Sequence, residues 1–132
     1  MLIAWARGKK GRDRQGYEDE IVSSVFGPLR YLNAEQNRKV VESILIQAWP
    51  ELKSNFSDTK KIETCDIEFW PNIAKEGRVE PDILILITHQ DKSKTRLLIE
   101  AKWNSKQNEN QLHDQWVEAN NQVNKTNVLH IF

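Results

Sequence analysis

Two acidic residues and a lysine lie where two apolar segments of the chain begin and end. Asp82 begins the apolar segment 82–88, and Glu100 and Lys102 lie near the end of the segment 95–103. Two carboxylates held close together repel each other, and a hard divalent cation relieves this by accepting oxygen ligands from both. These residue types therefore predict a metal site.

The ligand types indicate which metal this would be. The backbone carbonyl of Ala101 is a further oxygen ligand between Glu100 and Lys102. All-oxygen ligation favours Mg²⁺ or Mn²⁺, and the scattered histidines and single cysteine do not have a zinc spacing. The alternative is a structural salt bridge at a strand end, which one acid rather than two would satisfy better.

The register of the predicted hairpin decides which of these residues face each other. The two apolar segments should pair around the polar turn between them. A turn centred near Asp91 places Asp82 directly opposite Glu100, whereas a turn centred on Lys92 places it opposite Lys102. Glu100 and Lys102 share a face in either register, because side chains alternate along a strand.

The apolar pattern predicts two helices, a three-strand meander, a third helix and a last strand. Their ranges are 17–32, 34–49, 61–70, 82–88, 95–103, 107–121 and 127–132. Spacings of three and four indicate the helices, and the nearly continuous apolar run 82–88 is typical of a strand buried on both faces. We expect an α/β fold with a mixed central sheet, an antiparallel β-meander plus a crossover strand, flanked by helices.

The first two predicted helices each have an apolar face. Gly27 and Pro28 should kink or end the first helix. The residues expected to face the core are Ile21, Val22, Val25, Phe26 and Leu29 in the first helix, and Val40, Val41, Ile44, Leu45, Ala48 and Trp49 in the second.

Length and composition indicate one domain, 1–132, with residues 1–16 as a flexible basic arm. The 19 Lys and Arg residues balance the 19 Asp and Glu residues, which argues against a purely electrostatic binder of nucleic acid. A single cysteine, Cys65, excludes an internal disulfide. The first apolar stretch is too short for the expected pattern of a signal peptide, and no run approaches the roughly 20 apolar residues of a membrane helix. We therefore expect a cytoplasmic protein without a membrane segment.

The motif around the acidic residues resembles the PD-(D/E)XK nuclease superfamily, which has a restriction-endonuclease-like fold. Glu80-Pro81-Asp82 is followed by Ile99-Glu100-Ala101-Lys102 on the neighbouring predicted strand. The resemblance covers residues 17–132. It implies that Asp82 and Glu100 ligate Mg²⁺ or Mn²⁺, and that Lys102 positions or activates the attacking water.

Many members of this superfamily add an acid from the first helix. The candidates are Glu18, Asp19 and Glu20. Glu18 lies three and four residues before Ile21 and Val22, so it projects from the apolar stripe, and we expect it to be the third metal ligand. An equally simple reason for an acid here is the favourable interaction with the helix dipole in the first turn.

Some branches also carry a glutamine on the helix after the lysine. Gln111 and Gln115 are four residues apart and share a helix face. Gln111 is the expected active-site residue because it lies near the start of the helix, closest to Glu100. The competing interpretation is a solvated polar face.

The resemblance implies a Mg²⁺-dependent endodeoxyribonuclease that hydrolyses phosphodiester bonds, in host defence or in DNA processing. The expected partner is nucleic acid, DNA in particular, and the sequence leaves open a homodimer or a larger assembly. The alternative function is a catalytically inactive module with the nuclease fold, used for nucleic-acid binding or assembly.

Overall fold

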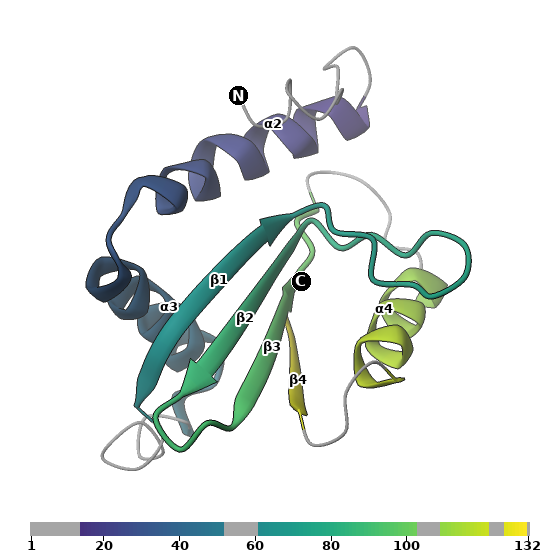
Figure 1. The fold of residues 1–132 in the computed structure, drawn as a ribbon. Helices are drawn as coiled ribbons and strands as arrows, with labels where there is room; N and C mark the ends of the chain where they lie inside the picture. Colours follow the sequence, from purple (N-terminus) through teal and green to yellow (C-terminus); the bar gives the residue numbers. More distant parts are fainter. Residues whose placement is uncertain (1–13, 52–60, 103–108, 122–125, 132) are drawn as a thin grey trace.

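The structure, a computed structural model, describes residues 14–51, 61–102, 109–121 and 126–131. A four-stranded sheet lies between α3 on one side and α4 on the other. Helix α2 passes over one end of the strands (Figure 1). No helix in these ranges is long and apolar enough to cross a membrane. The elements are α2 (Arg14–Phe26), the 3-10 helix η1 (Gly27–Tyr31), α3 (Ala34–Ala48), β1 (Ile62–Phe69), β2 (Ile83–His89), β3 (Lys94–Ile99), α4 (Glu109–Asn121) and β4 (Thr126–Ile131).

The four strands form one mixed sheet in the order β1-β2-β3-β4. β1 pairs antiparallel with β2 and β2 antiparallel with β3, whereas β3 and β4 are parallel. Parallel neighbours need a crossover connection, and α4 lies on the one that joins β3 to β4. The predicted α/β class, with an antiparallel meander and a crossover strand, is confirmed.

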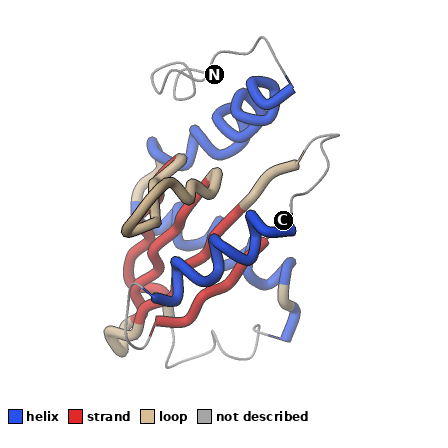
Figure 2. The backbone as a smooth tube through the Cα atoms, turned by 90° about the vertical axis from the view of Figure 1, so that its right-hand side faces the viewer, coloured by secondary structure: helices blue, strands red, loops and turns tan. Residues whose placement is uncertain are grey.

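Each face of the sheet packs against a different helix. On one face, Ile85 of β2 and Leu45 of α3 belong to the main hydrophobic core. On the other, Leu98 of β3 packs with Ala119 of α4 and with Ile73 from the loop before β2. Figure 2 shows the backbone of α4 lying across this face of the strands. The sheet is therefore covered on both sides, as its apolar strands predicted.

The two faces of β2 differ in burial. Side chains on one face are buried and those on the other are half-buried, in strict alternation. The prediction of a strand buried on both faces is thus correct for one face only. The second face is covered less completely because α4 packs mainly against β4, two strands away.

Gly27 and Pro28 end α2, as predicted. The α-helix stops at Phe26 and the chain continues as η1, with proline in the first turn of that 3-10 helix. The prediction of a flexible arm over 1–16 is wrong at its end, because α2 begins at Arg14. Residues 1–13 of that prediction lie outside the described residues.

The core faces of the helices are partly as predicted. Val22 is buried, but Val25 is 62% exposed, because the inward stripe of α2 also includes the buried polar residues Asp19 and Ser23. The buried face of α2 is therefore the one that carries Asp19, Val22 and Ser23, and Val25 lies outside it. On α3, Ala48, the last residue of the helix, is exposed rather than buried.

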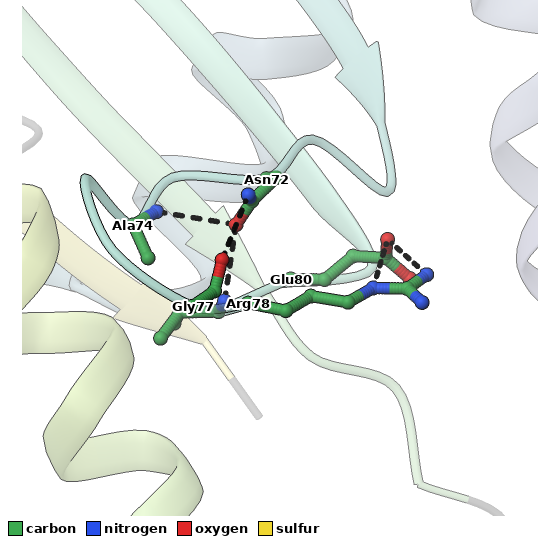
Figure 3. Close-up of polar contacts among 6 residues, drawn as sticks. Asn72, Ala74, Gly77, Arg78 and Glu80 are labelled. Carbon is green, nitrogen blue, oxygen red and sulfur yellow. Dashed lines mark hydrogen bonds and ion pairs between the residues drawn. The ribbon is translucent and has the colours of Figure 1, made fainter.

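The loop before β2 is held in one conformation by Asn72 (Figure 3). The Asn72 Oδ1 accepts the N–H groups of Ala74 at 3.3 Å and Val79 at 3.1 Å. Its Nδ2 donates to the carbonyl of Gly77 at 3.3 Å. Gly77 has a φ of 79°, a conformation that glycine adopts without strain. This bracing matters because the loop leads directly into Asp82.

We predict that two neighbouring truncations in β2 have different effects on stability. Ile85→Ala removes a fully buried side chain and should lower the free energy of unfolding by about 3 kcal/mol. Leu86→Ala lies on the half-buried face and should cost less than half as much. Urea denaturation of both variants measures this, and equal losses would contradict the assigned difference between the two faces.

Candidate active site

The register of the hairpin brings the two predicted acids together. Ile83 of β2 pairs with Ile99 of β3, so Asp82 and Glu100 are the next residues beyond this pair. The register that would place Lys102 opposite Asp82 is excluded. Of the two alternatives left open by the sequence, the one that pairs the carboxylates is the correct one.

The Glu100 carboxylate is buried and accepts three hydrogen bonds. Lys102 Nζ donates to Oε1 at 2.6 Å, and Gln111 Nε2 donates to the same oxygen at 2.7 Å. Gln115 Nε2 donates to Oε2 at 2.9 Å. A buried carboxylate needs such partners, because removing its charge from water is costly unless it is paired and hydrogen-bonded.

Asp82 is held between the ends of β1 and β3. Its carbonyl accepts the Trp70 N–H at 2.9 Å, and its carboxylate Oδ2 accepts the Ala101 N–H at 2.7 Å. Burial, followed by the charge of Glu100, raises the pKa of the Asp82 carboxyl to about 7. The Ala101 N–H lowers this pKa without cancelling the rise. The two carboxylates therefore remain in electrostatic conflict.

Helix α2, which carries Glu18, Asp19 and Glu20, crosses the same end of the sheet (Figure 1). Glu18 and Asp19 are both buried, whereas Glu20 is only half-buried. The charge of Asp19 contributes to the raised pKa of Asp82, and that of Glu18 acts on Lys102. The structure thus places the predicted residue, Glu18, within electrostatic reach of the cluster, and it places Asp19 there as well.

Lys102 is the cation among these acids. Burial by itself would lower the pKa of its ammonium, but the hydrogen bond to Glu100 and the charge of Glu100 outweigh that effect. The carboxylates of Asp82 and Glu18 add to the rise in pKa. Lys102 is therefore a charged group that compensates for only part of the surrounding negative charge.

This donor set fits a hard divalent cation. Mg²⁺ is commonly held by one or two carboxylates and keeps several waters, so Asp82 and Glu100 are a sufficient pair of anionic ligands. The raised pKa of Asp82 is the observation that supports this fit, because a cation would remove the repulsion that contributes to it. Among the described residues, no three His, Cys, Asp or Glu side chains are gathered as a metal site. Glu18 and the Ala101 carbonyl therefore stay predicted ligands.

Two residues at the cluster, Gln115 and Asp19, were not the ones predicted from the sequence. Gln115 has no exposed surface, so the interpretation of a solvated polar face is wrong for it, and it contacts Glu100 as Gln111 does. Asp19 lies three residues before Val22 on the buried stripe of α2, and this spacing was the signal that could have selected it.

His130 is a third residue that sequence spacing did not connect with the acids. It lies on β4 beside Leu98 of β3, and Glu100 is within electrostatic reach of its imidazole. Burial lowers the pKa of His130, and the charge of Glu100 opposes that change. Only the parallel pairing of β4 brings this histidine to the site.

Comparisons of the chain with known protein families, with curated proteins and with solved structures found no match.

We predict that the two glutamines differ in their contribution to stability. Gln115→Leu leaves Glu100 Oε2 buried without its donor and should lower the free energy of unfolding by about 2 kcal/mol. Gln111→Leu should cost about 1 kcal/mol or less, because Gln111 is half-buried and water can replace it. Urea denaturation in EDTA measures both values. A Gln115 variant as stable as the wild type would contradict the assigned contact.

We predict a pH dependence of stability that comes from Asp82. Folding raises the pKa of Asp82 from 3.8 to about 7. Its contribution to the free energy of unfolding is therefore fully present below pH 3.8 and is lost as the pH rises to about 7. In EDTA, the free energy of unfolding of the wild type should therefore fall over this range relative to that of Asp82→Asn. Asp66→Asn, at an exposed position of β1, is the matched control, and its free energy of unfolding should change with pH as that of the wild type does. Parallel curves for wild type and Asp82→Asn would refute the prediction.

Proposed function

We propose that the protein is a metal-dependent nuclease of the PD-(D/E)XK type, with a restriction-endonuclease-like core, that hydrolyses phosphodiester bonds in DNA. The observation that carries the proposal is the pairing of Asp82 with Glu100 beside Lys102 at the end of one hairpin. The order of elements supports it, since a helix precedes the antiparallel meander and a helical crossover follows. The choice of DNA rests on the resemblance alone.

Asp82, Glu100 and the Ala101 carbonyl would hold the cation, with Glu18 as a further ligand. When bound, Mg²⁺ or Mn²⁺ supplies a water of lowered pKa and neutralises charge on the phosphate. The chain's own contribution is to keep the two carboxylates fixed at the hairpin end.

Lys102 would orient the attacking water or the scissile phosphate and stabilise the negative charge that develops there. Its ammonium has three N–H donors and lies 2.6 Å from Glu100 Oε1, so it can contact a phosphate while keeping that bond. Gln111 and Gln115 would hold Glu100 in place during the reaction, because both donate to it from α4.

We predict that cleavage depends on the cluster. Purified protein should cut plasmid and linear DNA in Mg²⁺ and not in EDTA. Lys102→Ala should slow cleavage about 100-fold or more, since a preorganised charge on the transition state is lost. Asp82→Ala should abolish cleavage.

Lys92→Ala is the matched control for Lys102→Ala. Lys92 lies in the hairpin turn at the other end of the strands, where it pairs with Glu63, and its loss should leave cleavage unchanged. Unchanged cleavage by both Lys102→Ala and Asp82→Ala would refute the assignment. Labelled RNA and single-stranded DNA in the same assay define the substrate class.

A catalytically inactive nucleic-acid-binding or assembly module is the second candidate. The observation that favours it is that three side-chain donors already satisfy the Glu100 carboxylate. Calorimetric titration with Mn²⁺ separates the two functions. No heat of binding, with or without DNA, would favour the inactive module, whereas binding that Asp82→Ala removes would favour the nuclease.

A further inference from the structure

A groove of about 610 Å³ lies between α3 and the end of β4, on the α3 side of the sheet. Its lining is mostly apolar and includes Val40, Ile44 and Ala48 of α3 and Ile131 of β4. The one charged residue that lines it, Lys39, pairs with Glu35 on the same helix at 2.8 Å. A neutral apolar groove suits an apolar partner and not the phosphates of nucleic acid.

The groove adjoins an open edge of the sheet. β4 is the last strand of the sheet and pairs with β3 on one side, and no described strand pairs with its other side. The Ile131 carbonyl accepts the Glu100 N–H at 2.9 Å, so Ile131 faces β3. Backbone groups alternate in direction along a strand, so those of Val128 face the open edge.

The two edges of the sheet differ in how they are protected from pairing. Natural edge strands that face water usually carry charges or proline. β1, the other edge, exposes Glu63, Asp66 and Glu68. β4, with the sequence TNVLHI, has no acid, lysine, arginine or proline. The β1 edge is therefore built to stay in water, and the β4 edge is not.

We propose that the β4 edge and the adjoining groove form a homodimer interface, in which β4 pairs antiparallel with β4 of a second copy. A second copy is the partner that fits, because each strand supplies the donors and acceptors that the other needs, and no like charges meet. Pairing through β1 would instead bring Asp66 and Glu68 of each copy together, beside Glu63, which is paired with Lys92. A two-fold interface of this kind is self-complementary, the commonest symmetry of soluble oligomers.

The arrangement has a consequence for the acidic cluster. The two-fold axis that relates antiparallel neighbours is perpendicular to the sheet, so both copies keep α4 and Glu100 on the same face of one continuous sheet. Two sites on one face would suit a double-stranded substrate. The dimer itself does not depend on the proposed nuclease activity.

Sedimentation velocity of the full chain over a wide range of concentrations tests the proposal. The wild type should form a dimer. Ser43→Glu and Ala48→Glu each place a charge in the groove at an exposed position of α3, so the fold is retained, which circular dichroism checks. Each should weaken dimerisation about tenfold or more. Thr64→Glu places the same charge at an exposed position of β1 and should leave the dimerisation constant unchanged.

Hydrogen exchange of the Val128 amide tests the strand pairing separately. Its protection should increase with protein concentration in the wild type and not in Ala48→Glu. A wild type that is monomeric at all concentrations overturns the proposal, as does a dimer that resists both groove charges, or one that Thr64→Glu disrupts. Because no readout involves DNA cleavage, failure of the dimer and failure of the nuclease function are distinguishable.

Discussion

The antiparallel register of β2 and β3 is the constraint on which the rest of the structure depends. With Ile83 paired to Ile99, the hairpin directs one set of side chains to the core under α3 and the other set toward α4. A slip of one residue would exchange the two sets, so burial of the apolar set excludes such a slip. The same register places Asp82 opposite Glu100, which means that core packing positions the acidic cluster.

This arrangement buries the Glu100 carboxylate, which costs desolvation energy. Three donors surround its carboxylate, and two of them come from one face of α4. The helix therefore both connects β3 to β4 and stabilises the buried carboxylate. No comparable set of donors surrounds Asp82 among the described contacts, where the Ala101 N–H is its side-chain partner. Burial and the charge of Glu100 therefore both act on Asp82 and raise its pKa, and a cation that binds there would stabilise the folded chain.

The elements around the cluster restrict its movement. The loop braced by Asn72 leads into Asp82, the residue directly before β2. The Trp70 N–H donates to the Asp82 carbonyl and links it to the end of β1. On the other side, the Glu100 N–H donates to Ile131 and joins the site to β4. Because β4 also borders the α3 groove, the acidic cluster and the groove share one strand as their common support.

The sequence by itself determined the class of fold and the central residues of the candidate site. Continuous apolar strands, a short polar turn and helical spacing predicted the meander and the crossover, since these patterns depend on local periodicity. The same periodicity made Asp82, Glu100 and Lys102 neighbours. Local periodicity could not choose between the two hairpin registers, because they differ by two residues and a shift of two leaves every side chain on the same face of the sheet.

The tertiary structure alone decided the surroundings of that site. It buried Gln115 rather than leaving it in water, and it rotated α2 so that Asp19 as well as Glu18 faces inward and Val25 does not. It also brought His130 of β4 to Glu100. These placements depend on how helices and strands distant in the sequence pack, and the composition of each segment carries no information about the partner that it meets.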